Sequence, residues 1–140
     1  MIFALVWTAA LALTLAVAAL RGGRDERMTA VVLLLADLAS YLHPPTRWRR
    51  LDHISAVLDL ALLAFLLHRA LITTRWWPLY ACAAQLGACL GLLAYAINSK
   101  PLLLAYHTNA VVWSYGILAS LLLGTLLEVA RLRKEPERAQ

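Results

Sequence analysis

The chain has 140 residues, of which 62% are hydrophobic and 15% are charged, and its mean hydropathy is +0.70. Soluble domains have about 45–50% apolar and about 25% charged residues, so one small core cannot bury this much apolar surface and we expect lipid to solvate it. The 13 Lys and Arg residues outnumber the 8 Asp and Glu residues. They stand in short clusters between apolar runs, which argues against a nucleic-acid partner and suits lipid headgroups.

Five apolar segments predict an all-α fold, an integral membrane bundle of five transmembrane helices. The expected spans are residues 2–20, 28–42, 54–72, 76–97 and 102–130, which together form a single domain of residues 1–130. A span needs about 20 residues, so the second is short and the fifth is long enough to tilt or protrude. The connections are short, so sequential helices should be antiparallel neighbours. Residues 131–140 are expected to form a charged cytoplasmic tail.

The first segment has a competing interpretation as a cleaved signal peptide, because Ala16-Val-Ala18 has the small-x-small pattern of a cleavage site. However, no Lys or Arg precedes the apolar run, whereas Arg21, Arg24 and Arg27 follow it. This charge order favours an uncleaved helix with its N-terminus outside.

The distribution of basic residues tests the threading, because cytoplasmic loops carry an excess of Lys and Arg. With five spans, nine basic residues lie inside: Arg21, Arg24, Arg27, Arg69, Arg75, Arg131, Arg133, Lys134 and Arg138. Four lie outside: Arg47, Arg49, Arg50 and Lys100. The three outer arginines count against this threading, but leaving the second segment uncrossed sorts the charges less well. We therefore expect an outside N-terminus and a cytoplasmic C-terminus. Residue usage rich in Ala, Leu and Arg, with only two Lys residues, suggests a bacterial gene of high GC content.

Two carboxylates, Asp37 and Asp59, fall inside spans. An acid at mid-span costs about 2.5–3.5 kcal/mol on insertion scales, so each should face protein or water. The helical rise brings these acids and the polar start of the fifth span to one depth, about 9–12 Å below the outer end. The resulting candidate polar layer comprises Asp37, Asp59, His107, Asn109, Ser40, Tyr41 and Ser55.

Small residues predict where helices pack closely. Gly87 and Gly91 form a GxxxG pattern in the fourth span, and Gly116, Ser120 and Gly124 recur along one stripe of the fifth. We expect these stripes to pack within one chain rather than between two copies.

Cofactor chemistry has less support. Metal ligands are available in Asp37, Asp59, His107, His43 and His53, and a haem would need His43 or His53 to face His107. The sequence contains no HExxH or CxxC pattern, no spaced Ser-His-Asp set and no glycine-rich phosphate loop. We therefore predict no metal, no cofactor and no enzymatic activity.

The preferred functional hypothesis is a non-enzymatic accessory or scaffold subunit of a membrane assembly. Its expected partners are the lipid bilayer and either a second copy of itself or a larger membrane protein. The alternative is a small, oligomeric transporter or proton- or cation-coupled channel that uses Asp37 and Asp59, since buried carboxylates can exchange protons or bind cations.

Two short motifs, Arg75-Trp-Trp-Pro-Leu79 and Trp113-Ser-Tyr115, lie in the fourth and fifth segments. With the spacing between them, residues 55–128 resemble a family of small multi-spanning bacterial inner-membrane proteins that has no established activity. The resemblance implies a bacterial cytoplasmic membrane and carries over no site residues.

Overall fold

A computed structural model describes residues 2–42, 53–97 and 103–138, and these segments are helical apart from two short turns. The helices are α1 (Ile2–Arg21), α2 (Arg24–Leu42), α3 (His53–Ile72), α4 (Trp77–Ile97) and α5 (Leu103–Arg138). No strand occurs in the described ranges. The predicted all-α fold with five helices is therefore confirmed.

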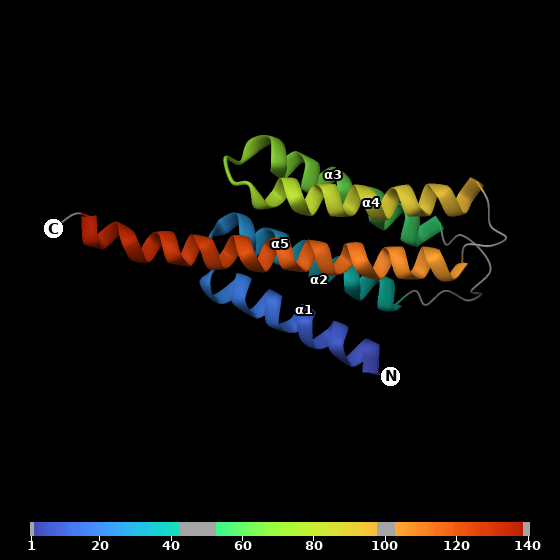
Figure 1. Cartoon of the computed structure of the whole chain (residues 1–140), viewed down its shortest axis with the longest axis horizontal. Helices are drawn as coiled ribbons and strands as arrows, with labels where there is room; N and C mark the ends of the chain where they lie inside the picture. The colour runs from blue at the N-terminus through green and yellow to red at the C-terminus, as the bar shows by residue number, and fades with distance from the viewer. Residues whose placement is uncertain (1, 43–52, 98–102, 139–140) are drawn as a thin grey trace.

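The helices run alternately up and down, so the two termini lie at opposite ends of the bundle (Figure 1). Each helix packs against the next one in the chain, and α5 closes the ring by packing against α1. The most extensive contact joins α4 and α5, and α2 also touches α5. One end of the bundle carries the α1–α2 and α3–α4 turns, and we call it the turn end.

Two helix boundaries differ by more than one residue from the sequence-based ranges. α2 begins at Arg24 rather than at residue 28, and its first turn contains Asp25 and Glu26. Carboxylates in the first turn of a helix interact favourably with its positive end, which explains the earlier start. α5 continues to Arg138, through the segment expected to form a separate tail. It extends past the other helices at the turn end (Figure 1).

Three described helices are long and apolar enough to cross a membrane. These segments are His53–Ile72, Trp77–Ala94 and Val111–Arg131, and a shorter apolar helix covers Leu5–Arg21. α2 does not belong to this set because residues 24–27, at its start, are all charged.

The core is narrow and the outer faces of the helices are apolar. Leu66, Trp77 and Leu121 are almost completely buried. Large apolar side chains also point outward from every helix, including Leu13, Leu35, Leu60, Leu90 and Leu123. Most of the apolar surface is therefore available to a surrounding medium rather than to the core.

Glycines bring α4 and α5 close together. A Cβ atom on Gly124 would overlap the ring of Trp77, and one on Gly87 would overlap the ring of Trp113. A Cβ on Gly91 would overlap Asn109 in the same way. Each glycine therefore makes room for a large side chain of the facing helix.

The remaining two residues of the α5 stripe are less crowded. A Cβ on Gly116 would lie 3.3 Å from the Cβ of Ala84. Ser120 is buried, and its hydroxyl donates to the Gly116 carbonyl at 2.8 Å within the helix. Both residues belong to the α5 face that packs on the bundle.

Candidate functional site: an acidic cavity and an ion-pair cluster

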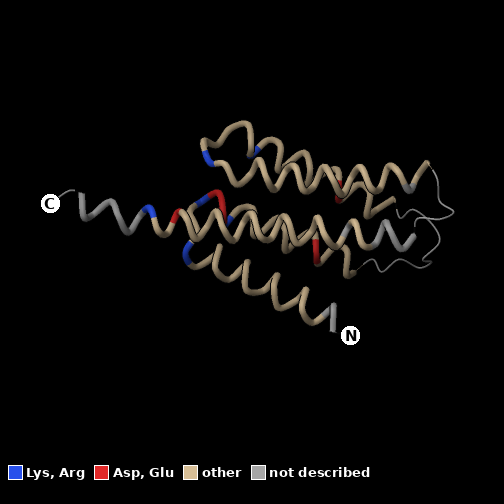
Figure 2. The backbone as a smooth tube through the Cα atoms, in the orientation of Figure 1, with Lys and Arg blue, Asp and Glu red and all other residues tan. Residues whose placement is uncertain are grey.

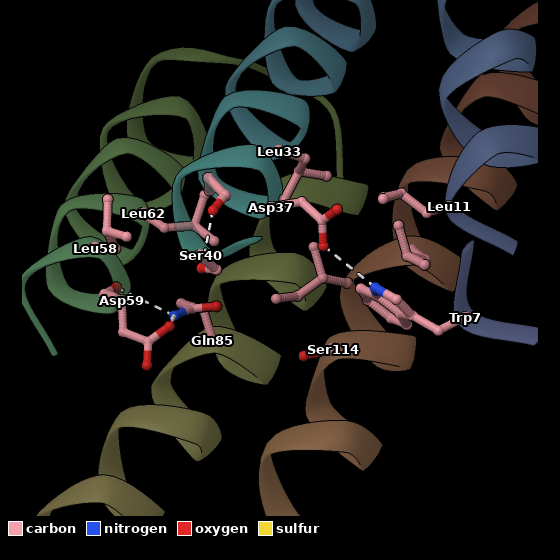
Figure 3. A pocket seen from close by; sticks show the side chains of 13 residues that line it. Trp7, Leu11, Leu33, Asp37, Ser40, Leu58, Asp59, Leu62, Gln85 and Ser114 are labelled. Carbon is pink, nitrogen blue, oxygen red and sulfur yellow. Dashed lines mark hydrogen bonds between the residues drawn. The ribbon is translucent and has the colours of Figure 1, made fainter. Parts of the chain in front are cut away.

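A cavity of about 130 Å³ lies among all five helices, and Asp37 and Asp59 both line it (Figure 3). Its lining residues are Trp7, Leu11, Leu33, Ala36, Asp37, Ser40, Leu58, Asp59, Leu62, Gln85, Ser114, Ile117 and Leu118. We call this space the acidic cavity. It lies in the half of the bundle away from the turn end, since Asp37 is twelve residues, or about 18 Å of helix, beyond Asp25.

Asp37 is held by a tryptophan of α1. The indole Nε1 of Trp7 donates a hydrogen bond to Asp37 Oδ1 at 3.2 Å. The Trp7 ring packs edge-on against Tyr115 of α5, with ring centroids 5.2 Å apart. On α2, Ser40 lies one turn beyond Asp37 and lines the same cavity, but its hydroxyl donates to the Ala36 carbonyl at 2.9 Å. The carboxylate of Asp37 therefore relies on a neutral donor from another helix.

Asp59 is held by Gln85 of α4, a residue that is only 2% exposed. Gln85 Nε2 donates to the Asp59 carbonyl at 3.1 Å and to Asp59 Oδ1 at 3.3 Å. Cys89, one turn further along α4, also points its thiol at the Asp59 carbonyl, at 3.8 Å. The Gln85 amide nitrogen faces α3, so its amide oxygen points in the other direction, into the cavity (Figure 3).

The other members of the expected polar layer are dispersed. Tyr41 is 81% exposed on α2, and Ser55 is half-buried on α3 without lining the cavity. Asn109 lies between α4 and α5, where it donates to the Gly87 carbonyl at 3.4 Å and accepts from Trp113 Nε1 at 2.7 Å. The structure thus brings Asp37, Asp59 and Ser40 together and places Asn109 at a packing contact.

The histidines considered as metal or haem ligands do not join this group in the part of the chain that is described. His53 is exposed at the start of α3. His43 and the side chain of His107 lie outside the described residues. Within the described residues, no group of three or more His, Cys, Asp or Glu side chains is placed to hold a metal ion.

A second polar site, which we call the ion-pair cluster, lies at the turn end. It comprises Asp25 and Glu26 of α2, Arg69 of α3, Thr73 and Arg75 of the α3–α4 turn, Trp77 of α4 and Glu128 of α5. Charged residues of both signs gather at this end of the bundle (Figure 2).

Glu26 is the centre of the ion-pair cluster and is completely buried. Its Oε1 accepts hydrogen bonds from Arg75 Nη1 and from Trp77 Nε1, the latter at 3.1 Å. Gly22 and Gly23 let the α1–α2 turn close over it: a Cβ on Gly22 would lie 2.7 Å from the Glu26 Cβ, and one on Gly23 would lie 3.0 Å from Oε2. The glycine pair is needed here for close approach.

Two arginines connect the carboxylates of this cluster. Arg75 bridges Glu26 and Glu128, with its Nη2 2.9 Å from Glu128 Oε1. Burial is the largest single influence on the Arg75 pKa and lowers it, but the attraction of Glu26, Glu128 and Asp25 outweighs burial and raises the pKa above its ordinary value. Its guanidinium group is therefore permanently charged.

Arg69 makes the second connection, an ion pair with Asp25. Thr73 also donates to Asp25, at 3.1 Å from Oδ2. Together the two arginines join α2, α3, α5 and the α3–α4 turn.

Sequence reasoning missed the ion-pair cluster because it counted these arginines only as a topology signal. The available clue was the adjacent pair Asp25 and Glu26, which interrupts a basic loop, together with the lone Glu128 near the end of the fifth segment. Pairing them with Arg69 and Arg75 required the helix order. Their partners are 44 to 53 residues away in the chain, from Asp25–Arg69 to Arg75–Glu128.

Comparison with protein families, characterised proteins and solved structures finds no match to this chain. Function is therefore inferred from the geometry of the two sites. They differ in one respect: the carboxylates of the ion-pair cluster have arginine partners, whereas those of the acidic cavity have neutral donors.

Proposed function

We propose that this chain is a small polytopic protein of a bacterial cytoplasmic membrane and works as a non-enzymatic accessory or scaffold subunit of a membrane assembly. Its five helices cross the bilayer with the N-terminus outside and the C-terminus in the cytoplasm. The partners are lipid and either another copy of the chain or a larger membrane protein.

The membrane part of this proposal is supported by the apolar outer faces and by the position of the charges. Three helices have the length and composition of spans. The described arginines, from Arg21 in α1 to Arg131 in α5, all lie toward the turn end. That end has the composition expected of a cytoplasmic face, where basic residues are enriched.

The scaffold role is supported by one observation above all: the polar side chains inside the bundle join helices to one another. Glu26 receives donors from the α3–α4 turn and α4, Gln85 joins α4 to α3, and Asn109 joins α5 to α4. Interhelical hydrogen bonds and ion pairs of this kind fix the shape of a bundle in lipid. A chain built in this way presents a fixed apolar surface to a partner.

Gentle purification from the native membrane tests this role. A tagged chain expressed at its natural level should recover a defined membrane protein in a constant ratio, and chemical cross-linking in intact cells should capture the same protein. The matched control is an equally tagged membrane protein of similar size. Recovery of lipid alone in both procedures would rule out a scaffold role with another protein.

A second candidate function, a small cation-coupled transporter or channel, is favoured by a specific observation: Asp37 and Asp59 line one cavity. Intramembrane carboxylates mark ion and proton paths in many membrane proteins. Flux measured in reconstituted vesicles should be lost in Asp37→Asn and in Asp59→Asn. The control is Tyr41→Phe, a change at an exposed residue of α2.

The same variants separate the two functions. An amide can still accept the hydrogen bond from Trp7 or from Gln85, so the scaffold function predicts normal folding and partner recovery for both Asn variants. Loss of flux with intact partner recovery would favour transport. Wild-type flux in both variants would eliminate the two acids as a transport site.

A further inference from the structure

The acidic cavity lacks a counter-charge among the described side chains. Asp37 and Asp59 are bonded to the neutral donors Trp7 and Gln85, whereas all three ion pairs found in the described residues lie in the ion-pair cluster. Both acids are half-buried, and a carboxylate that is partly withdrawn from water without a cation nearby is destabilised. Because two such carboxylates line one cavity, a positively charged ligand would be bound favourably there.

The polar groups that face the cavity are chiefly acceptors. The Trp7 N–H is used by Asp37, and the Gln85 NH₂ group is used by Asp59. The described hydrogen bonds of Gln85 all involve Nε2, and its amide oxygen points into the cavity from a side chain that is 98% buried (Figure 3). The cavity therefore offers two carboxylates and one amide oxygen as acceptors to a ligand that donates hydrogen bonds.

The remaining walls are apolar. Leu11, Leu33, Leu58, Leu62, Ile117 and Leu118 line the cavity. Its volume of about 130 Å³ is close to that of a cavity of roughly 150 Å³ that holds benzene. The Trp7 ring also lines it, and aromatic rings attract cations. The space is thus suited to a compact ligand with a cationic donor group and a short apolar part.

We propose that the acidic cavity binds a small organic ammonium ion, with its N–H donors directed at Asp37, Asp59 and the Gln85 amide oxygen and its alkyl part against the leucines. This inference deepens the second candidate function by naming the substrate class of the same site. A bare metal ion is a poorer occupant, because it needs several oxygen ligands within about 2.0–2.6 Å and most of the lining is hydrocarbon.

The test is direct binding to the purified full-length protein in lipid nanodiscs, measured by calorimetry and by the thermal unfolding midpoint. The probes are ethylammonium and propylammonium, the neutral alcohols ethanol and propanol, and Na⁺ and K⁺ at the same ionic strength. We expect saturable binding and a raised midpoint for the ammonium ions only. Equal effects of the alcohols would overturn the proposal, as would equal effects of Na⁺ and K⁺.

Variants place the binding in the cavity. Asp37→Asn and Asp59→Asn should each weaken ammonium binding at least tenfold. Arg27→Gln changes a charge at an exposed position of α2 outside the cavity and should leave the affinity unchanged. Leu62→Phe fills the cavity while keeping both acids, so it should reduce propylammonium binding more than ethylammonium binding and provides a test if either Asn variant fails to fold. Wild-type affinity in the folded cavity variants would refute the assignment.

The outcome is distinguishable from failure of the transport function. Ammonium binding without flux would support the ligand site and reject transport. Flux of another cation that depends on Asp37 and Asp59, without ammonium binding, would reject the ligand class and retain the transport function.

Discussion

At the scale of single residues, Glu26 is the one completely buried carboxylate among the described residues. It accepts hydrogen bonds from Arg75 and Trp77 through one oxygen, while its other oxygen, Oε2, is buried without a partner. Removing the Glu26 carboxylate leaves the buried Trp77 N–H without its acceptor, which costs about 1–3 kcal/mol, while Arg75 is 28% exposed and keeps its ion pair with Glu128. We expect Glu26→Ala to lower the free energy of unfolding by about 2 kcal/mol, measured by denaturation in mixed micelles.

Two further variants define the origin of this effect. Glu26→Gln retains an acceptor for Trp77 but loses the charge that pairs with Arg75, so its loss of stability should be smaller than that of the alanine variant. Arg27→Ala changes an exposed neighbour and should stay within about 0.5 kcal/mol of wild type. Equal stability of Glu26→Ala and wild type would show that the ion-pair cluster does not hold the turn end together.

At the scale of helices, the contact between α4 and α5 requires glycine at positions where an aromatic ring of the facing helix lies against the backbone. Trp77 is 2% exposed and cannot move away from a Cβ added at Gly124. Overpacking of this kind costs about 1–3 kcal/mol. We therefore expect Gly124→Ala to destabilise the bundle by that amount, read from the unfolding midpoint in detergent.

Gly116 on the same helix is the matched control. Its added Cβ would meet only the Ala84 Cβ, at 3.3 Å, and alanine is favoured over glycine inside a helix by about 0.8–1.0 kcal/mol. Gly116→Ala should therefore be neutral or stabilising. If both variants were destabilising, or both stabilising, the close approach of Gly124 to Trp77 would not explain the effect.

The two kinds of helix contact also show what could be predicted from the sequence. Five helices follow from the apolar segments, and the spacing of Gly116, Ser120 and Gly124 indicates a single face because residues three or four apart are neighbours on a helix. The ring that each glycine accommodates depends on the register between helices. The ion-pair cluster was missed for the same reason, since Arg75 reaches Glu26 and Glu128 only after α2 and α5 have been placed beside the α3–α4 turn.

At the scale of the whole molecule, the two polar sites occupy different halves of the bundle. The ion-pair cluster joins α2, α3 and α5 near the turn end, and the acidic cavity lies in the half beyond it. Buried hydroxyls of Thr14, Thr29 and Thr125 line no part of that cavity, and those of Thr29 and Thr125 are bonded within their own helices. In the described structure, the acidic cavity therefore lies in the half of the bundle that we propose faces outside.

This arrangement makes a prediction about membrane topology that concentrates on α2, the least apolar helix. The test uses single cysteines in a background with Cys82 and Cys89 replaced by alanine. Four exposed residues are replaced by cysteine one at a time: Arg24 and Thr74 at the turn end, and Tyr41 and Ile97 at the other end of the bundle. A membrane-impermeant maleimide should label positions 41 and 97 in intact cells, after the outer membrane is made permeable to it. Positions 24 and 74 should react only after the inner membrane is opened. Labelling of positions 24 and 41 from the same side would show that α2 does not cross the membrane. The reverse pattern at all four positions would show that α2 and α4 cross the membrane in the opposite orientation.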